Sequence, residues 1–206
     1  MIRYDILREN IPCEELFRLM KDSFQERKDQ GLNFTVLHAT FEDLKKLLDA
    51  YPVVVAFDEN PQTGEREYLG FQIVHVNGKE AIAGILAVSP KCKRTGIGSK
   101  IEEITQQFVV DEGCEYMSSN TSEDAISSVK WHLKNDYFKL KISSFKGKNY
   151  YTIFFRKQLK YHWFWSNKAL RAAYFNVYSF LYKLYRKKDG SLTAIGKLLG
   201  LFGKTQ

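Results

Sequence analysis

An Asn-Gly pair near the middle of the chain constrains the fold more than any other feature of the sequence. Asn77-Gly78 separates two runs with strand character, Tyr68 to Val76 and Glu80 to Val88. This dipeptide between apolar runs is typical of a tight β-hairpin. A third run, Val53 to Asp58, precedes them and is joined through the turn-forming segment 60–64. The sequence therefore predicts an antiparallel meander at the centre of the fold.

The residues before the meander predict one strand and two helices. Residues 2–9 alternate like a strand, and a helix is predicted to begin near Ile11. The polar stretch 26–33 is predicted as a loop. Thr40 and Asp43 predict a capped second helix that continues through Leu48. The apolar residues expected on the inner face of the first helix are Leu16, Leu19, Met20 and Phe24.

The residues after the meander predict a further alternation of helices and strands. A helical pattern starts at Ile97, a short strand follows at 115–119, and a second helix follows at 123–134. Two more strands, 138–145 and 150–155, are expected to form a closing hairpin. The fold class is therefore α/β (α+β), with a mixed, largely antiparallel central sheet flanked by helices.

The positive charge of the chain is concentrated at its C-terminal end. Residues 161–206 hold eight Lys and Arg residues and one Asp, which accounts for the whole formal net charge of +7. The sequence therefore predicts a charge-balanced domain over 1–160 and a basic, aromatic, helical C-terminal extension over 161–206. A uniform nucleic-acid-binding surface is disfavoured, so nucleic acid is not expected as a partner.

The extension contains an apolar stripe at helical spacing, here named the tail stripe. Such stripes pack against protein more often than not, so we expect docking on the rest of the chain or on a second copy in a homodimer. Peripheral contact with an anionic membrane is the alternative, because basic, Trp and Tyr residues accompany the stripe. The tail stripe comprises Leu170, Ala173, Tyr174, Val177, Phe180, Leu181 and Leu184. A shorter second helix is predicted around Leu192, Ile195, Leu198, Leu199 and Phe202.

Three features bear on the compartment. The sequence has no uninterrupted apolar run of about 18 residues, which excludes a spanning helix, and its first residues lack the apolar core of a signal peptide. Its three cysteines, Cys13, Cys92 and Cys114, form no CxxC pair, which argues against a zinc ribbon or a disulfide scaffold. We therefore expect a cytoplasmic protein with no bound metal.

A basic, glycine-containing loop at 89–98 follows the meander and leads into the next helix. Amides at a helix N-terminus are unpaired, and the helix dipole is positive there. Gly96 and Gly98 would let a phosphate approach these amides, so the loop predicts a pyrophosphate site. A P-loop motif is absent, and Ile101 stands where a dinucleotide-binding motif needs its third glycine. A basic loop without a ligand is the alternative.

Together with the order of elements, this loop resembles the GNAT superfamily of acetyl-CoA-dependent N-acetyltransferases over residues 2–159. The family motif [Q/R]xxGx[G/A] is matched by residues 93–98, with Lys93 in place of Gln or Arg. The resemblance implies acetyl-CoA as co-substrate, with its pantetheine arm along the main chain of Ala87 and Val88. It implies that the pyrophosphate is held by Lys93, Arg94, Thr95, Gly96, Ile97, Gly98 and Ser99.

A second signature of this family, N-x-x-A-x-x-x-Y-x-K-x-G-F, is matched more weakly. Aligning Lys134-Asn135-Asp136-Tyr137 with its K-x-G-F places His132 at the Tyr that serves many relatives as general acid. The resemblance thus implies that His132 protonates the departing thiolate. A solvent-facing helical residue without a role is the alternative for His132, and Tyr137 is the rival acid. Asn120 is implied as a polar contact to the pantetheine.

The function implied by the resemblance is direct transfer of the acetyl group from acetyl-CoA to a primary amine. A small metabolite or an amino sugar is the favoured acceptor, and the segment 27–34 corresponds to the region where such folds hold it. His38, His75 and Glu80 are candidate bases that no spacing distinguishes. The alternative is a catalytically weak acyl-CoA-binding module whose tail mediates partner or membrane contact.

Overall fold

The computed structural model describes residues 1–31 and 35–199, and it divides into two compact units, Met1–Met117 and Ser118–Gln206. The predicted extension belongs to the second unit, and the predicted domain boundary at residue 160 stays a prediction. Phe202 lies outside the described residues. None of the helices in the described part of the chain is both long and apolar enough to span a bilayer.

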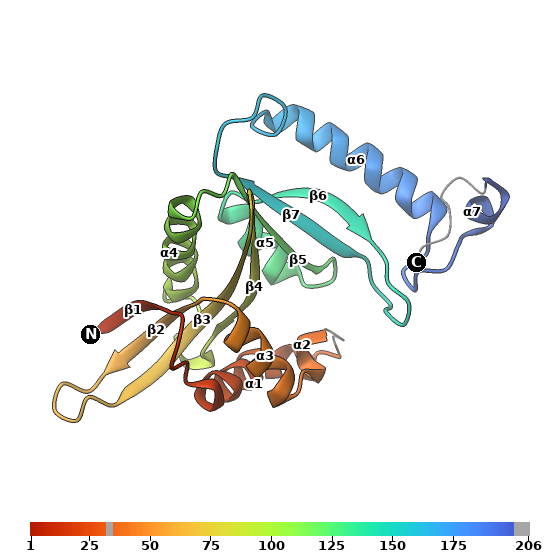
Figure 1. Cartoon of the computed structure of the whole chain (residues 1–206). Helices are drawn as coiled ribbons and strands as arrows, with labels where there is room; N and C mark the ends of the chain where they lie inside the picture. The colour runs from red at the N-terminus through yellow and green to blue at the C-terminus, as the bar shows by residue number, and fades with distance from the viewer. Residues whose placement is uncertain (32–34, 200–206) are drawn as a thin grey trace. The chain divides into compact units, whose positions relative to one another are not determined.

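Four antiparallel strands in the order β1-β2-β3-β4 form the sheet of the first unit (Figure 1). The predicted meander is confirmed. Its last hairpin pairs Asn77 with Glu80, so the two-residue loop is Gly78-Lys79, and Gly78 takes the left-handed φ of 57° that favours glycine. The strands are β1 (Ile2–Leu7), β2 (Val53–Glu59), β3 (Arg66–Asn77) and β4 (Glu80–Val88).

Helices α1 (Cys13–Asp29) and α3 (Phe41–Ala50) pack against one face of this sheet. All four apolar residues predicted for the inner face of α1 are buried. A capping box between Thr40 and Asp43 begins α3, as predicted. The loop predicted at 26–33 is wrong in its first residues, because α1 continues to Asp29, with Gln25 bonded to Asp29 one turn on. The short helix α2 (Thr35–His38) was not predicted.

Helix α4 (Ile97–Asp111) packs against strands β2, β3 and β4 and buries Ile97 and Ile101. Gly70 on β3 permits this approach: a Cβ atom there would lie 2.9 Å from Ile101 Cδ1. The buried Gln72 on β3 accepts a 2.9 Å hydrogen bond from the Thr105 hydroxyl of α4. These contacts fix the helix whose first turn follows the basic loop.

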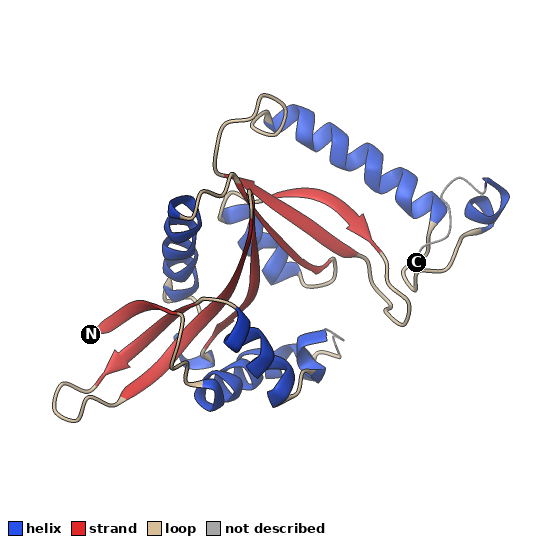
Figure 2. Cartoon of the chain, in the orientation of Figure 1, coloured by secondary structure: helices blue, strands red, loops and turns tan. Residues whose placement is uncertain are grey.

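The second unit contains a hairpin of β6 and β7 and the helices α5, α6 and α7 (Figure 2). The predicted hairpin is confirmed, and the strand order is β5-β7-β6. Helix α6 packs against β6, and the hydroxyl of Tyr182 accepts a 2.9 Å hydrogen bond from the amide of Ser144. The bounds are β5 (Tyr116–Ser122), α5 (Ile126–Lys134), β6 (Phe138–Ser143), β7 (Thr152–Gln158), α6 (Lys168–Tyr185) and α7 (Ala194–Leu199). The predicted fold class is therefore confirmed, including the helical C-terminal part.

Candidate functional site

The basic loop between β4 and α4 has a constrained backbone. The loop begins with a short 3-10 turn, Pro90–Cys92. Arg94 then takes a left-handed φ of 65°. Gly96 is also left-handed, with φ of 94°. The hydroxyl of Thr95 donates a 2.7 Å hydrogen bond to the carbonyl of Cys92, which ties the loop to itself. A non-glycine residue in this region costs energy, so the fold holds Arg94 there against its preference.

The first turn of α4 presents its amides without a side-chain cap. Gly96 is the N-cap residue, and no side chain of the described residues caps this end of the helix. Intrahelical bonding begins with the Lys100 amide, which donates to the Gly96 carbonyl at 2.9 Å. No acidic residue lies in the first turn. The amides of residues 97–99 and the helix dipole therefore make this end attractive to an anion.

Cations of the loop are partly balanced by acidic residues of the same unit. Lys93 forms an ion pair with Glu26 near the end of α1, and Lys91 lies 3.5 Å from a carboxylate oxygen of Glu67. The hydrogen bond from Lys93 lowers the pKa of the exposed Glu26 carboxyl. The ammonium group of Lys93 is thus already held by Glu26 before any ligand binds.

The end of β4 is occupied by a contact that the sequence did not predict. Ala87 is fully buried, and the amide of Val88 donates a 3.2 Å hydrogen bond to the hydroxyl of Ser23 on α1. Ser23 carries no signal in the sequence, because a serine at that position of an amphipathic helix is ordinary. Only the packing of α1 against β4 brings it to the strand end.

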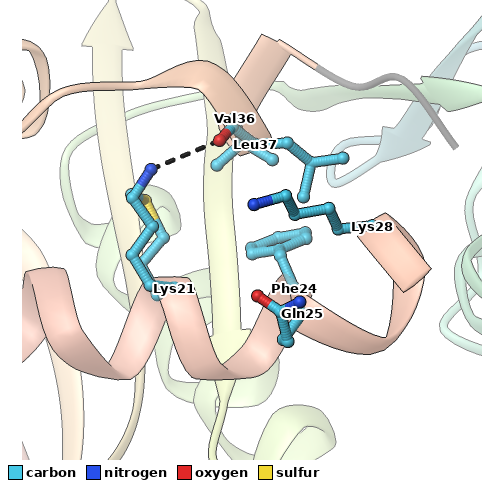
Figure 3. A pocket seen from close by; sticks show the side chains of 7 residues that line it. Lys21, Phe24, Gln25, Lys28, Val36 and Leu37 are labelled. Atoms are coloured by element: carbon cyan, nitrogen blue, oxygen red, sulfur yellow. Dashed lines mark hydrogen bonds between the residues drawn. The ribbon is translucent and has the colours of Figure 1, made fainter. Parts of the chain in front are cut away.

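A cavity of about 170 Å³ lies in the first unit between α1 and α2 (Figure 3). The ammonium group of Lys21 donates to the carbonyls of Ala39 at 2.6 Å and Leu37 at 3.3 Å. Lys28 belongs to the segment 27–34 implied for the acceptor, whereas residues 32–34 lie outside the described part of the chain. The lining residues are Met20, Lys21, Phe24, Gln25, Lys28, Val36 and Leu37.

His132 on α5 belongs to the second unit and is buried, with 5% of its surface exposed. The interpretation of His132 as a solvent-facing residue is therefore wrong. Its Nδ1 lies 2.8 Å from the carbonyl of Ser128 and so carries the proton, whereas Nε2 lies 3.0 Å from the hydroxyl of Ser119 on β5. The ring stacks on Phe155 at 4.4 Å between centroids. Aromatic packing turned the residue inward, which helical spacing alone could not reveal.

The rival acid Tyr137 lies beside His132, with ring centroids 5.3 Å apart. Tyr137 is buried, and the turn before it places Asp136 in the left-handed region with φ of 63°. The family signature has glycine at the position of Asp136, so the backbone conformation explains the glycine, and aspartate tolerates it better than most residues. Asn120 is exposed on β5.

The remaining predicted positions do not gather into a second site. His75 stacks on Tyr51 at 4.3 Å, Glu80 closes the β3–β4 hairpin, and His38 ends α2. Within the described ranges, no group of three or more His, Cys, Asp or Glu side chains is placed to hold a metal ion. The base therefore remains unassigned.

Compared by sequence, the chain matches no protein-family model and no curated protein. Compared by structure, it resembles the ribosomal-protein-S18-alanine N-acetyltransferase from Escherichia coli, with a TM-score of 0.62 and 12% identity over 79% of this chain and 96% of that one. A protein from Desulfovibrio desulfuricans assigned to the GNAT acetyltransferases gives a TM-score of 0.62 and 11% identity, over 78% and 100%. The PaiA N-acetyltransferase from Thermoplasma acidophilum, solved with coenzyme A, gives 0.60 and 12%, over 76% and 99%.

These identities are low, whereas each alignment spans nearly the whole of the solved chain. The likeness is therefore one of fold. The chain has the fold of the GNAT superfamily, as the basic loop and the element order predicted.

Proposed function

We propose that this chain is an acyltransferase that binds acetyl-CoA and transfers the acetyl group to the primary amine of a small molecule. The observation that carries the proposal is the uncapped start of α4, preceded by left-handed Arg94 and Gly96 in a basic loop. An unpaired helix N-terminus next to lysines suits a pyrophosphate. Two solved structures of this fold, the PaiA enzyme and the NatC complex, contain CoA, which supports the choice of cofactor.

The residues of the loop divide into those that shape it and those that would bind. The amides of Lys93 and Thr95 each donate at 3.4 Å to loop carbonyls, those of Pro90 and Cys92, so they hold the turn. The amides of Ile97, Gly98 and Ser99 would bind the pyrophosphate. On binding, the ammonium group of Lys93 would exchange the Glu26 carboxylate for a phosphate oxygen.

The end of β4 would hold the pantetheine arm. The main chain of Ala87 and Val88 is the implied partner, and the amide of Val88 would exchange the Ser23 hydroxyl for the ligand. Acetyl-CoA supplies, when bound, a thioester that an amine can attack. The chain would position the two reactants and transfer protons to and from them. The cavity lined by Lys28, in the segment implied for the acceptor, is the candidate acceptor site.

His132 is proposed as the general acid, with Tyr137 as the rival. In this role His132 would carry a proton on both ring nitrogens. Its Nε2 would pass one to the Ser119 hydroxyl, which would give its own proton to the thiolate, and the ring would return to the neutral form. The same geometry motivates the alternative function, an acyl-CoA-binding module with weak catalysis. Both ring nitrogens of His132 are engaged in a buried aromatic cluster, which is also the environment of a structural histidine.

Cofactor binding is tested by calorimetry with CoA on the Gly98→Asp variant. We expect at least about a hundredfold weaker binding, because the carboxylate repels the pyrophosphate and covers the amides. Gln62→Asp is the matched control: it adds the same charge at an exposed position of the turn 60–64 in the same unit. Unchanged affinity in a folded Gly98→Asp protein would refute the pyrophosphate site.

Catalysis is tested by CoA release on a panel of small amines. We expect His132→Gln and Ser119→Ala to lower kcat while leaving the Kd for CoA within about twofold, because neither side chain belongs to the basic loop. An effect of Tyr137→Phe alone would move the acid role to that residue. CoA binding without turnover of any amine would support the binding module instead.

A further inference from the structure

Helix α6 has two apolar faces, and within the described part of the chain the packing covers mainly one of them. The packed face carries Phe175, Tyr178 and Tyr182, which are half-buried, and Tyr185, which is buried. Lys139 of β6 lies over the ring of Phe175 at 5.5 Å, and Tyr182 bonds to Ser144. The tail stripe lies on the other side of the helix.

The tail stripe is exposed along its length. Val177 exposes 61% of its surface, Phe180 exposes 64% and Leu181 exposes 56%. Leu170, Tyr174 and Leu184 are each more than a third exposed. A soluble surface rarely presents so many large apolar side chains in one row unless something covers them.

Aromatic residues and cations extend this surface at both ends of α6. Tyr161 and Trp163, just ahead of the helix, are exposed by 85% and 68%. Trp163 differs in this from Trp165, which stacks on Phe138 of β6 at 5.8 Å. Lys187 follows the end of the helix and is exposed, whereas Lys168 lies on the side of the helix opposite the tail stripe.

The charge of residues 161–188 favours an anionic surface over a second copy of the chain as the partner of the tail stripe. Between Tyr161 and Lys188 the sequence holds six Lys and Arg residues and no Asp or Glu. Of these, Lys183 and Lys188 form ion pairs with Glu123 of the same unit. A second copy would bring a like-charged segment against this one, with no acidic residue in the segment to offset the repulsion.

The width of the tail stripe also favours a flat surface over a single partner helix. Leu170, Ala173, Val177, Phe180 and Leu184 repeat at alternating spacings of three and four, as in a coiled-coil seam. Tyr174 and Leu181 add a further apolar position to each heptad, so the stripe is wider than a two-stranded seam requires. A broad apolar face with Lys187 beyond its end suits a flat, negatively charged, apolar surface.

We propose that the tail stripe of α6 binds the surface of an anionic phospholipid bilayer, with the helix lying in the plane of the interface. Val177, Phe180 and Leu181 enter the boundary between headgroups and acyl chains. Trp163 and Tyr161 lie at headgroup level, where amphipathic rings are favoured. Lys187 contacts lipid phosphates.

The test is co-sedimentation of the full chain with vesicles of phosphatidylcholine, alone or in an equimolar mixture with phosphatidylglycerol. We expect binding to the mixed vesicles that weakens as salt rises, and little binding to phosphatidylcholine. Val177→Glu/Leu181→Glu should abolish this binding. The control Ile126→Glu/Leu133→Glu removes two exposed apolar residues of α5 in the same unit, with the same charge change, and should bind like the parent.

A second variant tests the charge separately. Lys187→Gln should weaken binding about fivefold at low salt, which corresponds to about 1 kcal/mol. The control Lys168→Gln removes the same charge from the opposite side of the helix and should bind like the parent. Circular dichroism and thermal melting establish that each variant is folded. The emission of Trp163, isolated in a Trp131→Phe/Trp165→Phe background, should shift to shorter wavelength on the mixed vesicles.

Three outcomes would overturn the proposal. One is no binding to the mixed vesicles, or equal loss of binding in the α5 control. Another is a dimer in analytical ultracentrifugation that Val177→Glu/Leu181→Glu dissociates, without vesicle binding by the parent, which would assign the stripe to a second copy. The third is binding of a single-stranded oligonucleotide, without vesicle binding, that survives the same substitution.

Discussion

Helices α4 and α6 look alike in sequence and differ in what they do with their apolar residues. Both have apolar side chains recurring at helical spacing over more than three turns. In α4 this face is buried, and Ile101 is fully inaccessible. In α6 the corresponding face is the exposed tail stripe, and the helix packs through its other side. Periodicity therefore predicts that an apolar face exists, and it does not predict what covers that face.

The chemistry of the two packed faces explains the difference. Strand β3 offers α4 a glycine, Gly70, against which Ile97 and Ile101 fit closely. The residues after strand β6 offer α6 polar groups, and the helix packs on them with Tyr182, whose hydroxyl bonds to Ser144.

The largest effect on the free energy of unfolding is expected at the buried face of α4. Ile101→Ala should lower the free energy of unfolding by about 2–5 kcal/mol, because it leaves a cavity between α4 and β3. Urea denaturation of the full chain measures this. Val110→Ala, at an exposed position of the same helix, is the control and should change little. A small effect at Ile101 would mean that α4 is less tightly packed than its burial indicates.

A smaller effect is expected at the packed face of α6. Tyr182→Phe should lower the free energy of unfolding by about 0.5–1.5 kcal/mol, because the Ser144 amide loses its acceptor while the ring remains. Tyr174→Phe removes a hydroxyl from the tail stripe and serves as the comparison. Equal losses from both substitutions would contradict the assignment of the packed face.

The smallest effect is expected on the tail stripe itself. Val177→Ala should change the free energy of unfolding by no more than about 0.5 kcal/mol, because the side chain has little buried surface to lose and alanine favours a helix. Measured by the same urea titration in the absence of lipid, a loss above about 1 kcal/mol would show that protein covers the stripe.

Much of the first unit followed from local rules. The meander, the cap at Thr40 and the helix after Gly96 each depend on residues close together in sequence, so turn chemistry and periodicity were sufficient. The candidate site was predicted at the basic loop, because its residues are also close together in the sequence. Ser23 was missed because its role depends on a strand end 65 residues away.

The sequence by itself determined which residues are apolar, the order of the helices and strands apart from α2, and that a basic loop precedes α4. Only the tertiary structure decided that His132 is buried against Phe155, that Gly70 admits Ile101, and that α6 packs through its tyrosines. The physical reason is that burial depends on the partner surface as much as on the residue. A helix with two apolar faces can bury either one, and the strand it meets selects between them.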